Sequence, residues 1–214
     1  MRPDGTRVRD LTAIMQALPY VMPKRYDAQN WAEEYLDEDA IRDYIRAKRR
    51  EGRTVTHMSL LVSAYYRAVL KNPKINYFVM NRRIYKRNHF CFSFVILKTR
   101  ADGTPDETSL KVYLEPEDTV FTVTEKIRST IEKNQNIQHN NDTDRFAKFV
   151  FGVPGLARAV FGLAGFLDRH DLLPRSIIEL SPFHTSLFVT NLASINTPCI
   201  FPVSYTHLRA HETS

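Results

Sequence analysis

Two segments in the first third of the chain carry hydrophobic residues at helical spacing. The pattern predicts one helix from Asp39 to Gly52, where the glycine is a typical helix stop, and a second after Thr56, a typical N-cap residue. The pair Asn72-Pro73 ends the second helix, because proline cannot continue it. The expected buried stripes comprise Ile41, Tyr44 and Ile45 in the first helix, and Met58, Leu61, Val62, Tyr65 and Val69 in the second.

Short apolar runs replace the helical period further along the chain. Three strands are predicted, over residues 75–80, 89–98 and 109–115, because these runs are rich in aromatic and β-branched residues. The basic segment 81–88 is predicted to be a turn-rich connection. Asp102-Gly103, with a proline shortly after, marks the turn before the third strand.

The helical period returns in residues 121–135. Thr122, followed three residues later by Glu125, matches a capping box at the start of this helix. Residues 134–144 are polar and are predicted to form a loop. The expected buried stripe of the helix comprises Val123, Ile127 and Ile131.

The most apolar stretch, residues 146–170, is long enough to cross a membrane. Lys148, Pro154 and Arg158 interrupt it, which argues against a membrane span. We therefore predict two helices that are broken at residues 152–154 and packed in a core or a subunit contact.

Composition indicates a globular protein. A chain of 214 residues with 43% hydrophobic and 25% charged residues is long enough for one large domain with its own core. The pattern of a secretory signal is not visible, so the expected compartment is the cytoplasm. Cys91 and Cys199 lack the number and spacing of a disulfide framework or a metal knuckle, and both are expected to be reduced and buried.

The net charge of +6 raises the question of a nucleic-acid partner. Basic residues cluster at 46–53 and 81–88, but neither cluster alternates with aromatic residues as an RNA-binding strand does. We predict no nucleic-acid binding and interpret both clusters as solvated surface. A basic rim would equally suit an anionic cofactor, and the candidate phosphate contacts by charge alone are Arg82, Arg83, Lys86 and Arg87.

Residues 181–201 read SPFHTSLFVTNLASINTPCIF and predict an apolar, hydroxyl-rich strand. The part HTSLFVTNLASI resembles a strand in the catalytic domain of the dihydrolipoyl acyltransferases of 2-oxo acid dehydrogenase complexes, a group that also contains chloramphenicol acetyltransferase. Segments 72–96 and 118–131 are similar to the family's substrate-channel strand and to the helix that leaves its central sheet. The resemblance extends from Pro19 to Phe201.

The resemblance implies an α/β (α+β) fold, a two-layer sandwich in which helices flank a mixed sheet. It also implies a homotrimer with active sites between subunits, where coenzyme A and an acyl acceptor enter from opposite ends. The implied reaction moves an acyl group from a coenzyme A thioester to a thiol, hydroxyl or amine, without a metal. The chain shows neither a lipoyl domain nor a Pro/Ala-rich linker, so the acceptor stays open between a lipoyl group and a small molecule.

Matching the strand residue by residue places Ser186 at the family's hydroxyl position, which donates a hydrogen bond to the tetrahedral oxyanion. Without the resemblance, Ser186 is interpreted as a strand hydroxyl bonded to the backbone. Thr190 and Asn191 match the polar pair that supports the catalytic loop. His184 is interpreted as structural, because no carboxylate stands at a motif-like spacing to orient it.

The family's general base is the second histidine of a His-His-x-x-x-Asp-Gly motif that follows this strand. The sequence contains no such motif, so the chain as written is expected to be inactive. His207 and His211 share one helical face, as a zinc ligand pair does, but they do not fit the motif.

The residues after Pro202 resemble translated sequencing-adaptor DNA instead. Residues 203–213 match one reading frame of a transposon-based library adaptor without a mismatch. We therefore expect an acyltransferase-like domain over residues 1–201, incomplete at its C-terminus, followed by a non-native tail over 202–214. His207, His211 and Glu212 are then not ligands.

Two other classes of function stay open. One is a non-catalytic trimeric binding or scaffold protein of the same fold, in which Ser186 is only structural. The other is a peripheral membrane protein that uses residues 146–167 as an apolar, basic surface.

Overall fold

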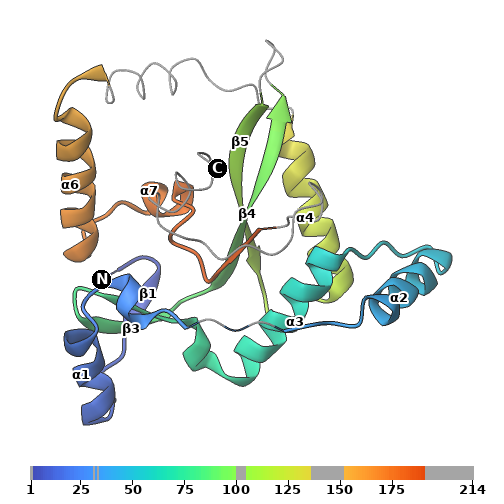
Figure 1. The fold of residues 1–214 in the computed structure, drawn as a ribbon, viewed down its shortest axis with the longest axis horizontal. Helices are drawn as coiled ribbons and strands as arrows, with labels where there is room; N and C mark the ends of the chain where they lie inside the picture. Colours follow the sequence, from blue (N-terminus) through green and yellow to red (C-terminus); the bar gives the residue numbers. More distant parts are fainter. Residues whose placement is uncertain (1, 31, 33, 100–104, 136–151, 191–214) are drawn as a thin grey trace, which may run out of the picture.

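The computed structural model of the chain describes residues 2–30, 32, 34–99, 105–135 and 152–190. The described residues form helices and two separate three-stranded sheets (Figure 1). The chain therefore has the mixed α+β architecture that the sequence predicted. Asn191, Cys199 and the tail over 202–214 lie outside the described residues.

The smaller sheet is antiparallel and lies near the N-terminus. Its strand order is β1 (Gly5–Arg7), β3 (Arg83–Arg87) and β2 (Tyr77–Met80). The prediction of a turn-rich connection over residues 81–88 is wrong, because most of this segment is the central strand of the sheet. Only Asn81 and Arg82 form the turn, with φ angles of 47° and 58°. Positive φ at both central residues is the geometry of a tight two-residue hairpin.

The second sheet is mixed and has the order β5 (Pro105–Leu114), β4 (Phe90–Thr99) and β6 (Leu187–Val189). Strand β4 pairs antiparallel with β5 and parallel with β6, with Phe92 opposite Leu187. The predicted strands over 89–98 and 109–115 are confirmed, and β5 begins earlier than expected. Of the strand predicted over residues 181–201, the described residues 181–190 form strand only at Leu187–Val189, and residues 182–186 form turns and bends.

One face of the mixed sheet is covered by α3 (His57–Lys71) and α4 (Val120–Gln135), as Figure 1 shows. Alternate residues of β4 and β5 point into this layer, because side chains alternate across a strand. The predicted stripe of α4 is confirmed at its centre, since Val123 and Ile127 are buried. The core comprises Val62, Tyr66, Val69, Phe90, Phe92, Phe94, Leu110, Val112, Leu114, Val123 and Ile127.

The stripe predicted for α3 is partly wrong. Val62 and Val69 are buried, but Leu61 is 49% exposed and Tyr66 takes its place in the core. Tyr66 lies against Phe90 with a ring-centroid distance of 4.6 Å. Tyr66 thus packs its ring against an aromatic residue of β4, a contact that helical spacing alone does not predict.

Hydroxyl caps define where both core helices begin. Thr56 caps α3 as predicted, and its hydroxyl accepts a hydrogen bond from the backbone N–H of Ser59 at 3.1 Å. In α4 the expected capping box is displaced by one turn. The helix begins at Val120, and Thr119 and Thr122 exchange side-chain to backbone hydrogen bonds. Thr119 and Thr122 stand three residues apart, so each could be the N-cap of a helix that starts here.

We expect the Thr56→Ala substitution to lower the free energy of unfolding by about 1 kcal/mol, because the N–H of Ser59 then loses its acceptor. Urea denaturation followed by circular dichroism measures the change. Thr12, the cap of the short exposed helix α1 (Ala13–Val21), offers a matched control, and Thr12→Ala should cost less.

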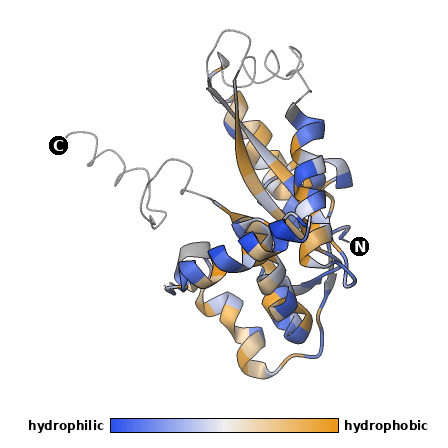
Figure 2. Cartoon of the chain, turned by 90° about the vertical axis from the view of Figure 1, so that its right-hand side faces the viewer, coloured by the Kyte–Doolittle hydropathy of each residue, from blue (hydrophilic) through white to orange (hydrophobic). Residues whose placement is uncertain are grey.

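Helix α2 (Glu38–Arg50) stands away from the sheet and is mostly hydrophilic (Figures 1 and 2). Of its predicted stripe, Ile45 is buried, while Tyr44 is 40% exposed. The stop at Gly52 is confirmed, since this glycine has a φ of 76°. Short 3-10 turns occupy Arg25–Ala28 and Pro73–Asn76.

Helix α6 (Leu156–Arg169) is the described part of the most apolar stretch, and α7 (Arg175–Leu180) follows it. Of the two packings expected for this stretch, a core is wrong for α6, because none of its residues is buried, while a subunit contact stays a prediction. The part of the stretch before residue 152 lies outside the described residues. The apolar side chains of α6 remain on the surface, where Phe161, Leu163 and Phe166 are each more than half exposed. Within the described residues, no helix is long and apolar enough to span a membrane.

Candidate functional site

Ser186 lies where the chain enters the mixed sheet, directly before β6. Its backbone N–H donates to the carbonyl oxygen of Cys91 at 2.8 Å, and its hydroxyl oxygen accepts from the backbone N–H of Cys91 at 3.3 Å. The neighbouring Thr185 hydroxyl donates to the same carbonyl at 2.9 Å. The hydroxyl of Ser186 therefore has a partner in the central strand, as expected of a strand hydroxyl bonded to the backbone.

Of the two other predicted site residues, the structure describes Thr190 but not Asn191. Thr190 follows β6 directly and is exposed. Asn191 lies outside the described residues. The structure therefore brings Ser186 and Thr190 to opposite ends of one short strand, and their proposed shared role in supporting a catalytic loop stays a prediction.

On the second face of the mixed sheet, opposite the core helices, the side chains beneath residues 181–186 are small or polar. Cys91 and Ser93 are fully buried here, which confirms the expectation for Cys91. Lys111 reaches across this face and donates to the carbonyl oxygens of Ile178 at 2.9 Å and His184 at 3.1 Å. Burial lowers the pKa of Lys111. The two hydrogen bonds of this lysine connect α7 and the residues before β6 to the sheet.

A buried ionic cluster surrounds Arg2. The guanidinium bonds Asp4 at 2.7 Å, and it reaches the carboxylate of Asp168 at the end of α6 at 2.6 Å. Asp171, in the turn after α6, lies 3.5 Å from the same guanidinium and accepts a hydrogen bond from the hydroxyl of Tyr85 at 3.0 Å. Three carboxylates therefore share one arginine, which joins the N-terminus, the small sheet and the α6–α7 turn.

His184 is held at both ring nitrogens. Its Nδ1 lies 2.8 Å from the hydroxyl of Ser181, and its Nε2 lies 3.3 Å from Asp168. No carboxylate stands at a motif-like spacing from His184 in the sequence, yet the fold brings the carboxylate of Asp168 to its ring. Sequence reasoning missed Asp168 because the α6–α7 turn, rather than a short motif, brings it to the histidine.

The four basic candidates for phosphate contact do not form one patch. Residues alternate along β3, so Arg83 and Arg87 share one side while Lys86 lies on the other. Arg87 is largely buried, stacks on the ring of Phe78 at 4.5 Å and lies 3.6 Å from Asp4. Burial lowers its pKa. Arg82, on the hairpin turn, lies over the ring of Tyr20 at 5.3 Å.

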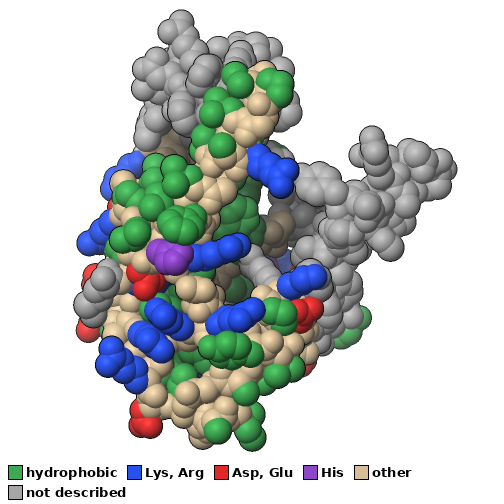
Figure 3. Space-filling model, turned by 90° about the vertical axis from the view of Figure 1, so that its left-hand side faces the viewer, with side chains coloured by type: hydrophobic (Ala, Val, Ile, Leu, Met, Phe, Trp, Pro, Cys, Tyr) green, Lys and Arg blue, Asp and Glu red, His purple; other side chains and the backbone are tan. Residues whose placement is uncertain are grey.

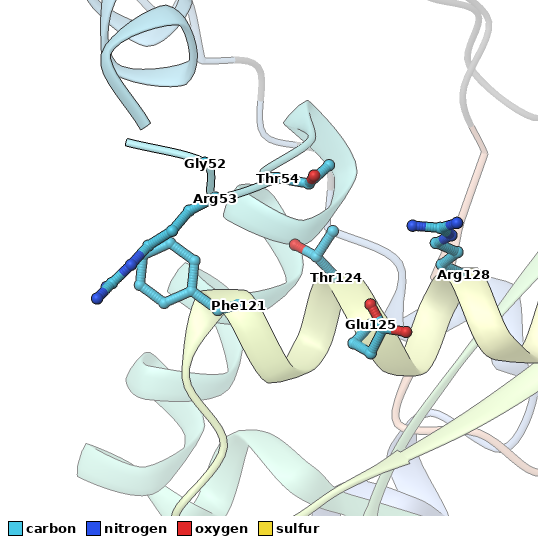
Figure 4. A pocket seen from close by; sticks show the side chains of 7 residues that line it. All are labelled: Gly52, Arg53, Thr54, Phe121, Thr124, Glu125 and Arg128. Carbon is cyan, nitrogen blue, oxygen red and sulfur yellow. The ribbon is translucent and has the colours of Figure 1, made fainter. Parts of the chain in front are cut away.

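A hollow of about 340 Å³ lies between α4 and the connection that leads into α3 (Figure 4). Arg53 lies over the ring of Phe121 at 4.7 Å, while Glu125 and Arg128 lie at the other end. The lining therefore carries mixed charge, with one carboxylate and two guanidinium groups. The lining comprises Gly52, Arg53, Thr54, Phe121, Thr124, Glu125 and Arg128.

Among the described residues, no group of three or more His, Cys, Asp or Glu side chains is placed to hold a metal ion. His207, His211 and Glu212 lie outside the described residues.

No protein-family model, no curated protein and no solved structure matches this chain. The functional interpretation therefore depends on the residues themselves and on the geometry described above.

Proposed function

We propose that this chain carries the fold of a coenzyme A-dependent acyltransferase, related to the dihydrolipoyl acyltransferases and chloramphenicol acetyltransferase. The observation that carries the proposal is the position of Ser186. It stands directly before a strand that runs parallel to the central strand of a mixed sheet, with helices on the other face. The resemblance of residues 184–195 assigns the oxyanion hydroxyl to this serine.

The proposed reaction is transfer of an acyl group from a coenzyme A thioester to a thiol, hydroxyl or amine. Attack on the thioester carbonyl places negative charge on its oxygen, and a fixed hydroxyl donor there stabilises the transition state by a few kcal/mol in a dry site. The Ser186 oxygen is held by the N–H of Cys91, which leaves its proton free to donate. Thr190 and Asn191 would support the loop beyond β6, and a homotrimer would complete each site.

We expect negligible acyltransferase turnover from the 214-residue chain, because its sequence contains no His-His-x-x-x-Asp-Gly motif to supply the base. Loss of a general base lowers rates by about 100- to 10,000-fold. Thiol release from acetyl-coenzyme A, with dihydrolipoamide or a small alcohol as acceptor, measures the activity. An intact chloramphenicol acetyltransferase assayed in parallel is the positive control, and robust turnover by this chain would contradict the expectation.

The proposal itself is tested by sequencing the source DNA across the codon for Phe201. A reading frame that continues into His-His-x-x-x-Asp-Gly supports the enzyme. A genomic frame that encodes PVSYTHLRAHETS removes it. Coenzyme A binding to the purified chain, measured by calorimetry, is a second test, and a chain that binds no coenzyme A would also argue against the enzyme.

The hydrogen bond from the N–H of Cys91 to Ser186 favours a second candidate, a non-catalytic trimeric binding or scaffold protein of the same fold. In that case the hydroxyl only completes the entry to β6. Sedimentation analysis that shows a stable trimer, together with no coenzyme A binding, would favour the scaffold.

A further inference from the structure

Three side chains near the C-terminal end of α7, outside β6, are linked one to the next by polar contacts. The hydroxyl oxygen of Ser181 lies 2.8 Å from Nδ1 of His184, and Nε2 of the same ring lies 3.3 Å from Asp168. A hydroxyl, an imidazole and a carboxylate in hydrogen-bonding sequence form the arrangement that activates a serine nucleophile. The two ring nitrogens are exchanged relative to the familiar serine hydrolase triad, but the chemistry needs only one donor and one acceptor nitrogen.

The carboxylate fixes which nitrogen carries the proton. An ionised carboxylate only accepts hydrogen bonds, so Nε2 of His184 donates to Asp168 and Nδ1 keeps a lone pair toward Ser181. Burial raises the pKa of Asp168, but hydrogen bonds from His184 and Arg2 outweigh it, and the net pKa is lowered. Asp168 therefore stays ionised near neutral pH, with its other oxygen held by Arg2 at 2.6 Å.

Backbone hydrogen bonds hold Ser181 and His184 in place, and the side chains of His184 and Asp168 are still partly exposed. The backbone of Ser181 donates to Ile177 at 3.0 Å, and the carbonyl of His184 accepts from Lys111 at 3.1 Å. The side chains of His184 and Asp168 each keep 16% exposure. Next to them Phe183 is 76% exposed, and the face that contains α6 gathers further hydrophobic side chains (Figure 3). A small ester with an apolar acyl group could approach Ser181 along this surface.

We propose that Ser181, His184 and Asp168 form a second, esterase-type site, in which Ser181 accepts the acyl group of a small activated carboxylic ester. Ser181 and His184 are the catalytic residues, and Asp168 is a positioning residue that acts through His184.

The step balances within these groups and the ester. The Ser181 oxygen attacks the ester carbonyl carbon, and its proton passes to Nδ1 of His184. The bond between the carbonyl carbon and the leaving alcohol oxygen then breaks, and the alcohol takes the proton from Nδ1. The products are an O-acyl serine and the free alcohol. Neither coenzyme A nor Ser186 takes part, so this site is independent of the proposed acyltransferase.

The experiment uses the full chain and p-nitrophenyl acetate. Release of p-nitrophenol is followed by absorbance, and peptide mass spectrometry locates the acetyl group. We expect acetylation of Ser181, lost in Ser181→Ala, slowed about 100-fold in His184→Gln, and unchanged in the matched control Ser176→Ala on the same helix. Circular dichroism confirms that each variant folds.

The unmodified chain gives a test that no folding defect can affect. Acetylation of the unmodified chain should take place at Ser181 and not at Ser176, an exposed serine of α7, because Nδ1 of His184 lies 2.8 Å from the hydroxyl of Ser181. Acetyl groups only on lysine or tyrosine, or equal acetylation of Ser181 in His184→Gln, would overturn the proposal, whatever the outcome with coenzyme A.

Discussion

Replacing Phe92 with alanine is expected to lower the free energy of unfolding by about 3–5 kcal/mol. Phe92 is fully buried on the central strand of the mixed sheet, in the layer that α3 and α4 cover. Its ring stacks on that of Phe94, with centroids 5.8 Å apart. The substitution removes the buried apolar surface of the ring and leaves a cavity, which the close-packed neighbours fill only in part. Urea denaturation at equilibrium measures the loss.

Leu97→Ala is the matched control for Phe92→Ala. Leu97 lies on the same strand but is 64% exposed, so its truncation should cost less than about 1 kcal/mol. A similar loss in both variants would mean that the core does not lie between the sheet and the two helices.

The second large effect is expected from Arg2→Met, which should cost about 3–5 kcal/mol. The side chains of Arg2 and Asp4 are each only 1% exposed, and methionine would leave the carboxylates of Asp4 and Asp168 without their shared cation. An uncompensated buried charge costs more than the intact pair contributes. Arg42→Met is the control, because Arg42 pairs with Glu38 on the exposed face of α2 and such pairs contribute little.

Acid titration of stability distinguishes this cluster from simple packing. The pKa of Asp168 is lower in the folded chain than in the unfolded chain. Its contribution is therefore present above the unfolded value, near pH 4, and is lost as the pH falls through the folded value. The wild-type chain should lose this stability below about pH 4, and Arg2→Met should lose less of it. An identical acid dependence in both chains would contradict the role of Arg2.

Periodicity predicted the elements that pack on the sheet, because burial imposes the pattern. Helical spacing predicted α3 and α4, and apolar runs rich in aromatic and β-branched residues predicted β4 and β5. Strand β3 was missed because its charged residues hide the alternation, in which Tyr85 is the buried member. The short strand β1 at the N-terminus has no apolar pattern of its own, since it is held by pairing with β3.

The candidate sites were harder to predict because long-range contacts create them. Ser186 could be named from its resemblance, yet nothing local shows that its hydroxyl bonds Cys91, 95 residues earlier. Arg2 binds one carboxylate oxygen of Asp168 across 166 positions, and the other oxygen lies 3.3 Å from Nε2 of His184. Only the folded arrangement of the α6–α7 turn reveals these partners.

The parallel pairing of β4 with β6 also leads us to expect a particular order of folding. Strands β4 and β5 are joined by a short connection and can pair early, whereas β6 reaches β4 only after a loop of 95 residues closes between Cys91 and Ser186. Closing a long loop costs entropy before any contact compensates for it, and it slows folding. We therefore expect Ser186 to reach its place after β4 and β5 have paired, so that the hydroxyl is positioned late in folding.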